Sequence, residues 1–238
     1  MNDVLTGKFA CGSSLAEFDR WWHSQGAWVE PVNQCRGGES GVQLLPRGVG
    51  EPPLYCKRQT GHTYRTPLHP FARPTVLREL QAYRAFARLG IATPRVVYGG
   101  ARKWRGQWQA LLVTEALQDF VSLTQWYADG GDAALKESVL CRLASTLARL
   151  HLGGWQHGCC YPNHIFVKAG EDENGAPRVE IALLDLEKSR RRLSVRAASA
   201  HDLDQLKRRC GNMPEADLSF FLRAYEKRLA DPSESPQT

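Results

Sequence analysis

Three charged residues stand along the sequence in an order that suits phosphate chemistry. Lys57 ends the apolar run 54–56, Glu79 lies in a segment with helical periodicity, and Asp185 follows the apolar run 181–184. A lysine anchored by a glutamate can bind nucleotide phosphates, and an aspartate at a strand end can bind a divalent cation. The order therefore indicates phosphoryl transfer. The alternatives are a solvated lysine, a surface glutamate and an aspartate that caps a turn.

The segment 157–164 stands where a kinase motif places its catalytic loop, but it departs from that motif. It reads His-Gly-Cys-Cys-Tyr-Pro-Asn-His, with Cys159 in the place of an aspartate and His164 in the place of an asparagine. A thiol does not orient an acceptor hydroxyl as a carboxylate does, and imidazole is a softer ligand than magnesium prefers. Two readings stay open: an active enzyme that relies on positioning and metal, and a pseudokinase that binds nucleotide without turnover.

Two other features of this loop have structural interpretations. His157 is expected to brace the loop through hydrogen bonds rather than to act as a base. Cys159 and Cys160 are expected to form a packed, reduced pair, because adjacent cysteines lack the usual spacing of a zinc site.

The segment 36–41, Arg-Gly-Gly-Glu-Ser-Gly, is a weak candidate for a glycine-rich nucleotide loop. Gly38 and Gly41 can expose backbone amides to phosphate. The full motif spacing is absent, and a plain hairpin turn explains the glycines equally well.

Strand-like runs dominate the first half of the chain. They cover 27–30, 42–45, 54–57, 95–98 and 109–114, with a turn at Gly106 between the last two. One helix is expected after the capping residue Ser14, and another begins at Pro74 and stops at Gly90. These runs predict an antiparallel sheet of about five strands with one inserted helix.

The second half is more helical. Leucines recur at helical intervals from Leu135 to Leu150 behind a candidate cap at Asp132, and strands at 165–168 and 179–184 flank the turn-rich segment 170–177. Sheet first and helices afterward is an α+β order, which argues against a doubly wound sheet. We expect an N-terminal lobe at 1–115, a C-terminal lobe at 116–229 and a flexible tail at 230–238.

Composition limits the class of protein. The chain has 238 residues, 42% hydrophobic content and a formal net charge of +6, which favours anionic partners. Its seven cysteines include no CxxC pair, and no apolar run reaches the ~18 residues of a membrane span. We expect a cytoplasmic protein with free thiols. Nucleic acid is not an expected partner, since no reader motif is present.

Four segments resemble the lipopolysaccharide kinase (Kdo/WaaP) family, within the protein kinase-like superfamily. They are FARPTVLRE at 71–79, ALLVTE at 110–115, QHGCCY at 156–161 with His-Ile after two further residues, and LDLEKSRRRL at 184–193. The resemblance covers about residues 25–210. It implies a bilobal fold, with an antiparallel sheet and one helix in the N-lobe and a mainly helical C-lobe.

The resemblance also implies a site and a substrate. The nucleotide ATP would be bound by Lys57, Glu79, Gly38, Gly41 and Glu115, and Mg²⁺ or Mn²⁺ by Asp185 and His164. Asp185 and the Cys159 position would be catalytic. The expected acceptor is a sugar of the lipopolysaccharide core or a similar anionic group. The family's loop carries a histidine at the eighth place but retains the aspartate that Cys159 replaces.

Basic residues flank the predicted site. Lys188, Arg190, Arg191, Arg192 and Arg196 follow Asp185 and are candidates to bind an anionic acceptor. The alternative is a solvated surface, the usual role of such a run. Arg58, Arg65 and Arg73 form a second basic segment that is suited to an anionic membrane surface, so peripheral contact with the inner membrane is expected.

Overall fold

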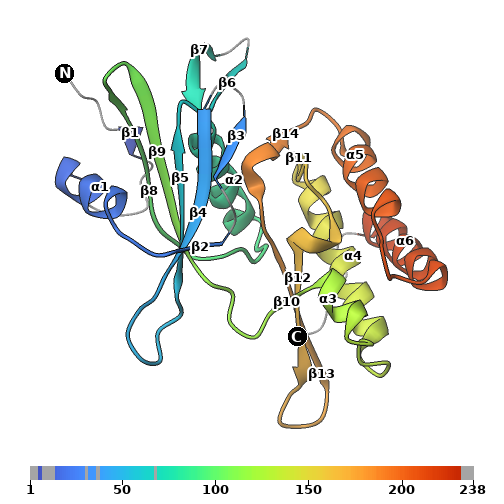
Figure 1. Ribbon diagram of the computed structural model, residues 1–238. Helices are drawn as coiled ribbons and strands as arrows, with labels where there is room; N and C mark the ends of the chain where they lie inside the picture. The colour runs from blue at the N-terminus through green and yellow to red at the C-terminus, as the bar shows by residue number, and fades with distance from the viewer. Residues whose placement is uncertain (1–4, 7–13, 30–31, 36–37, 67–68, 232–238) are drawn as a thin grey trace. The chain divides into compact units, whose positions relative to one another are not determined.

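A computed structural model describes residues 5–6, 14–29, 32–35, 38–66 and 69–231 (Figure 1). The chain forms two compact units. The first comprises Met1–Tyr83 and Pro94–Gln118, and the second Arg84–Thr93 and Asp119–Thr238. The sequence placed a single division after residue 115, whereas the packing assigns the segment Arg84–Thr93 to the second unit. Of the expected tail, 232–238 lies outside the described residues.

The first unit contains a seven-stranded antiparallel sheet in the order β1-β8-β9-β5-β4-β2, with β3 paired to β4. Its strands are β1 (Leu5–Thr6), β2 (Ala27–Trp28), β3 (Asn33–Cys35), β4 (Gly38–Leu45), β5 (Leu54–Thr60), β8 (Val96–Trp104) and β9 (Gln107–Glu115). All five predicted strand runs are present. The short strands β1 and β3 were missed, as was the separate pair β6 (Thr63–Thr66) and β7 (His69–Pro74).

Helix α1 (Leu15–Trp22) covers one face of this sheet. Its N-cap is Ser14, whose side chain accepts a hydrogen bond from the Glu17 amide as predicted. Phe18 is fully buried in a core cluster with Cys56 of β5 and Val113 of β9. These strand residues therefore face α1, and their neighbours along each strand face the other way.

Helix α2 (Thr75–Arg88) follows β7 directly. It begins one residue after Pro74, which ends the strand rather than starting the helix. Gly90 follows with φ +65°, a left-handed conformation that suits glycine after a helix end. In Figure 1, α1 and the start of α2 lie on opposite faces of the sheet.

The second unit is mainly helical. Its helices are α3 (Leu123–Ala128), α4 (Lys136–Leu152), α5 (Val195–Arg208) and α6 (Glu215–Ala230). A three-stranded sheet joins β10 (Val121–Ser122), β12 (Ile165–Glu171) and β13 (Pro177–Leu183), and a small pair joins β11 (Trp155–Gln156) to β14 (Arg190–Arg191). Among the residues shown, no helix is both long and apolar enough to cross a bilayer.

The predicted leucine repeat forms the buried face of α4, which packs against α6. The predicted cap is wrong: Asp132 Oδ1 accepts from the Ala134 amide in the turn before the helix, and Leu135 occupies the N-cap without a side-chain bond. An antiparallel sheet first and helices afterward confirm the α+β class.

Candidate active site

Lys57 and Glu79 form a largely buried ion pair within the first unit. Lys57 lies on the inner strand β5, opposite Leu112 of β9, and its side chain faces away from α1 because its neighbour Cys56 faces toward it. Lys57 Nζ donates to Glu79 Oε2 at 2.8 Å. The two side chains are only 17% and 4% exposed. The carboxylate therefore fixes the direction of an ammonium group that solvent still reaches.

Gly38 and Gly41 do not lie in a loop. Both are strand residues of β4, and residues 36–37 of the expected loop lie outside the described residues. A Cβ atom at Gly38 would lie 2.4 Å from the Thr60 carbonyl oxygen, and one at Gly41 would lie 2.6 Å from the Trp28 ring. Close packing thus explains both glycines, and their predicted contact with nucleotide remains a prediction.

Glu115 at the end of β9 has its carboxylate bound by arginines. Arg95 donates from Nε at 2.6 Å and also from a second nitrogen, and Arg47 Nη1 donates at 3.1 Å. The hydrogen bond from Arg95 leads the effects that lower the pKa of Glu115. These pairs give the side chain a structural role, and its expected role toward nucleotide stays a prediction.

Asp185 sits just beyond β13 in a left-handed backbone conformation, with φ 58° and ψ 62°. A residue other than glycine in this region carries strain of about 1–3 kcal/mol, which the surrounding structure must hold. The Leu184 amide donates to the His164 carbonyl at 2.9 Å, and Leu186 is fully buried. Leu184 and Leu186 hold the backbone on either side of Asp185, so that its carboxylate points toward the loop 157–164. There, Asp185 Oδ2 lies 3.7 Å from His164 Nδ1.

Cys159 lies in the loop 157–164 with 2% of its surface exposed. Burial raises the pKa of its thiol to about 12, the Asp185 carboxylate adds to this rise, and the Lys188 ammonium opposes it. The thiol is therefore protonated near neutral pH and cannot accept a proton from an acceptor hydroxyl. Its backbone carbonyl accepts from His164 Nδ1 at 2.9 Å.

The side chains of Cys159, His164 and Asp185 converge. One donor atom from each lies within 4.8 Å of the other two. Magnesium prefers a nearly octahedral set of oxygen ligands, whereas this group offers one sulfur, one nitrogen and one carboxylate. As a set, the three residues do not fit Mg²⁺.

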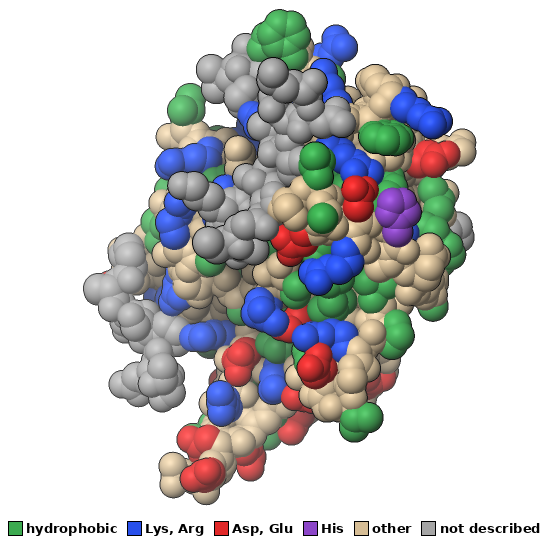
Figure 2. Space-filling view, turned by 90° about the vertical axis from the view of Figure 1, so that its left-hand side faces the viewer, with side chains coloured by type: hydrophobic (Ala, Val, Ile, Leu, Met, Phe, Trp, Pro, Cys, Tyr) green, Lys and Arg blue, Asp and Glu red, His purple; other side chains and the backbone are tan. Residues whose placement is uncertain are grey.

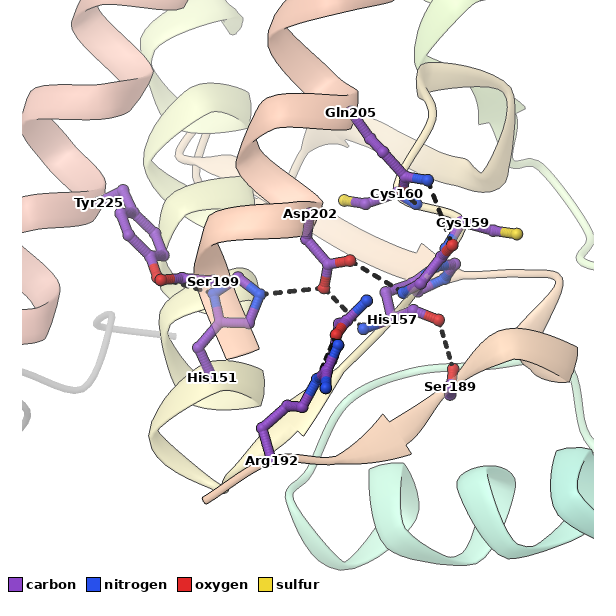
Figure 3. Close-up of polar contacts among 12 residues, drawn as sticks. His151, His157, Cys159, Cys160, Ser189, Arg192, Ser199, Asp202, Gln205 and Tyr225 are labelled. Carbon is purple, nitrogen blue, oxygen red and sulfur yellow. Dashed lines mark hydrogen bonds and ion pairs between the residues drawn. The ribbon is translucent and has the colours of Figure 1, made fainter. Parts of the chain in front are cut away.

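A buried aspartate that the sequence did not single out anchors this loop. Asp202 of α5 is fully buried, and its two oxygens accept from the backbone amides of His157 at 2.6 Å and Gly158 at 2.8 Å (Figure 3). Its Oδ2 also lies 3.2 Å from His151 Nε2, and His151 Nδ1 lies 2.7 Å from the Tyr225 hydroxyl. This network links α4, α5 and α6 to the loop.

Further bonds hold the loop backbone. Gln205 Oε1 accepts from the Cys160 amide at 2.8 Å, and Ser189 Oγ donates to the His157 carbonyl at 2.9 Å. His157 Nδ1 accepts from the Cys159 amide at 3.2 Å. Burial lowers the pKa of His157 to about 4, so the ring is neutral and stabilises the loop through its hydrogen bond.

One sequence signal for Asp202 exists: it shares a helix face with Ala198 and Leu206, both fully buried.

The basic run after Asp185 divides into exposed and engaged residues. Arg190, Arg191 and Arg196 are exposed. Lys188 is also exposed but its side chain forms a hydrogen bond with that of Cys159, and Arg192 Nε donates to Gln156 Oε1 at 2.6 Å. Arg192 therefore stabilises the pairing near β11.

Negatively charged side chains lie at the turn between β12 and β13. The exposed acidic residues 171–173 belong to this turn, which is at the lower end of Figure 2.

Comparisons with known proteins show the family and the fold. The sequence model of the lipopolysaccharide kinase (Kdo/WaaP) family matches residues 19–225. Protein InaA of Escherichia coli (strain K12) is 40% identical over 212 residues, which cover 87% of this chain and 94% of that protein. The solved structure of WaaP in complex with acyl carrier protein is 20% identical, with a TM-score of 0.60 over 91% of this chain and 86% of that chain. This last likeness shows the fold, which is protein kinase-like.

Proposed function

The chain belongs to the lipopolysaccharide kinase (Kdo/WaaP) family, and from that premise we propose that it is an ATP-dependent phosphotransferase. Its acceptor is a sugar of the lipopolysaccharide core or a similar anionic group. The observation that carries the proposal is the ion pair between Lys57 and Glu79, with its 2.8 Å bond and its low exposure. We place the reaction in the cytoplasm, at the inner face of the inner membrane.

Lys57 supports nucleotide binding because its ammonium group is positively charged and because its side chain is held in one orientation. Phosphoryl transfer depends mainly on positioning and on neutralising the phosphate oxygens. A lysine held by a buried carboxylate loses less conformational freedom when it binds phosphate, because its side chain is already ordered. In the second unit, the bonds from Asp202 and Gln205 fix the loop that would face the reacting groups.

Exposed cations support an anionic acceptor. Arg190 and Arg191 are both exposed on β14, one strand that follows Asp185 closely. A guanidinium group can bind a phosphate through two parallel hydrogen bonds, which favours arginine for phosphorylated sugars. Arg192 already donates its Nε–H to Gln156, which leaves its other N–H groups for an acceptor.

A nucleotide-binding sensor without turnover is the second candidate, and Cys159 favours it. A thiol that is 2% exposed and protonated offers no base to an acceptor hydroxyl. The base contributes little in a loose phosphoryl transition state, so the thiol alone does not exclude activity.

An ATP assay separates the two candidates. The purified chain is incubated with ATP, Mg²⁺ or Mn²⁺ and lipopolysaccharide core fractions, and both nucleotide binding by calorimetry and ATP consumption are measured. Consumption that depends on the acceptor supports the phosphotransferase, whereas binding without consumption supports the sensor. Absence of binding at millimolar nucleotide contradicts both.

Site variants test the placement of the nucleotide. Lys57→Ala and Asp185→Ala should weaken nucleotide binding and leave the fold intact. The matched controls are Lys168→Ala and Asp119→Ala, which break an exposed ion pair with side-chain exposures of 41% and 76%. If the first two variants bind nucleotide as the controls do, the site is misplaced.

A further inference from the structure

The hairpin of β8 and β9 in the first unit ends in an exposed turn. Trp104 and Gln107 pair across it, and the two turn residues, Arg105 and Gly106, have φ of 49° and 80°. A two-residue turn of this kind favours asparagine or glycine, because other residues are strained at positive φ. Residues 103–107 are all exposed, and a Cβ atom at Gly106 would have nothing within 4 Å. The turn therefore projects into open space, with an arginine at a position that local backbone preference disfavours.

Strand β7 lies against this hairpin. Trp108 Nε1 donates to the Ala72 carbonyl at 3.1 Å. Lys103 pairs with Trp108 in register, and its Nζ lies 5.3 Å from the centre of the Trp108 ring. In Figure 1, β7 and the turn between β8 and β9 lie at the same end of the first unit. These contacts bring Phe71, the neighbour of Ala72, to the end of the hairpin that carries Lys103.

Four exposed side chains at this end form a mixed apolar and basic patch, the hairpin surface: Phe71, Lys103, Trp104 and Arg105. Phe71 is 85% exposed and Trp104 is 46% exposed. The sequences 63–74 and 98–110 contain no acidic residue. At the upper end of Figure 2, hydrophobic and basic side chains lie next to one another. Exposed aromatic rings beside cations mark a surface that contacts an anionic partner with an apolar part.

We propose that the hairpin surface docks the chain on an anionic phospholipid bilayer. Aromatic side chains enter the interfacial layer of a bilayer, and lysine or arginine beside them binds the acidic headgroups. Single-stranded nucleic acid also binds aromatic and basic side chains, but in grooves that follow its backbone. A projecting turn fits a planar bilayer better than it fits such a strand. The inference deepens the proposed function and rests on it in one respect, the placement of the reaction at a membrane.

The structure changes the set of arginines that the sequence suggested for membrane contact. Arg58 is partly buried and donates to Ser24 Oγ at 3.0 Å, so it contributes little to an exposed surface. Arg65 is exposed on β6, the strand paired with β7, and adds a cation near the hairpin surface. Arg102 on β8 is buried and its Nη1 lies 2.6 Å from Asp19 Oδ1, so it holds α1 rather than a lipid.

Vesicle binding by the full chain, without nucleotide or lipopolysaccharide, tests the proposal. Vesicles of phosphatidylglycerol and phosphatidylethanolamine are compared with vesicles of phosphatidylcholine alone, and bound protein is measured by flotation. We expect binding to the anionic vesicles only. This binding should decrease as sodium chloride rises from about 0.05 M to about 0.5 M, because salt screens the headgroup charge.

Charge variants test whether the cations of the hairpin surface carry this binding. The double variant Lys103→Gln/Arg105→Gln should bind the anionic vesicles about 25-fold more weakly, at about fivefold for each cation removed. The matched control is Lys207→Gln/Arg223→Gln, which removes the same two charges from exposed positions on α5 and α6. The control should bind as the wild type does, although its net charge equals that of the first variant.

Apolar variants test whether the aromatic side chains enter the bilayer. The double variant Phe71→Ser/Trp104→Ser should bind the anionic vesicles at least about tenfold more weakly, because it removes apolar area that the bilayer would bury. Both positions are exposed, so the fold should be retained. The control is Val49→Ser, which changes a fully exposed apolar residue in the loop between β4 and β5, at the opposite end of β5 from the hairpin turn. This control should bind as the wild type does.

Three results would overturn the proposal. The first is a wild-type chain that does not bind the anionic vesicles at about 0.1 M salt. The second is a loss of binding no greater in the hairpin variants than in their controls, which would assign the contact to another surface. The third is binding of a single-stranded oligonucleotide in place of vesicles. The vesicles contain neither ATP nor a sugar acceptor, so failure to dock is distinguishable from failure of the phosphotransferase.

Discussion

The substitution Asp202→Asn should loosen the loop 157–164 and destabilise the chain by about 3 kcal/mol. The native carboxylate accepts two backbone amides, from His157 at 2.6 Å and from Gly158 at 2.8 Å. An asparagine keeps one acceptor oxygen and points an amide donor at the other N–H group. One charge-assisted bond is lost and one buried donor is left unsatisfied, and each effect is worth about 1–3 kcal/mol.

Asp204→Asn on the same helix is the control. Asp204 pairs with Arg208, and the two side chains are 52% and 69% exposed. Loss of this exposed pair should change the free energy of unfolding by about 0.5 kcal/mol or less. Both variants are compared with the wild type by urea unfolding.

Amide hydrogen exchange locates the effect. In Asp202→Asn, the amides of His157 and Gly158 should exchange much faster than in the wild type, because their acceptor is impaired. In Asp204→Asn, they should exchange at the wild-type rate. If the two variants have equal stability and equal exchange at these amides, the buried carboxylate does not anchor the loop.

Three further outcomes are expected. Glu79→Gln should lower ATP affinity about tenfold in calorimetry, because it removes the charge that orders Lys57, and an unchanged affinity would contradict that role. Cys159→Asp should leave ATP affinity nearly unchanged and raise turnover if the loop stays folded; a folded variant that is slower than an active wild type would indicate an unconventional mechanism. His157 has a pKa of about 4 when folded, against an ordinary 6.5, so its stabilising effect of about 3 kcal/mol is present above pH 6.5 and is lost as the pH falls toward 4. His157→Asn should remove this part of the pH dependence of urea unfolding, and a parallel loss of stability in both proteins would show that other groups cause it.

Local patterns in the sequence were enough for the longer strands, for several helices and for part of the site. Helix α1 and its Ser14 cap, the leucine face of α4 and the five longer strands follow from the periodicity of apolar residues within a few positions. The order of Lys57, Glu79 and Asp185 indicated phosphoryl transfer, and the resemblance of four segments to a known family implied the kinase-like fold. Their proposed roles toward ATP remain predictions.

Only the tertiary structure decided which side chains meet. Asp202 contacts loop amides 45 and 44 positions earlier in the chain, and the helix face that it shares with Ala198 and Leu206 does not indicate these partners. The glycines of the expected loop proved to be strand residues, because backbone from β5 and the following turn fills the space beside Gly38. The pairing of β12 with β13 brought Asp185 to Cys159 and His164. Such contacts depend on how distant elements pack, and packing is a property of the folded chain as a whole that no local spacing encodes.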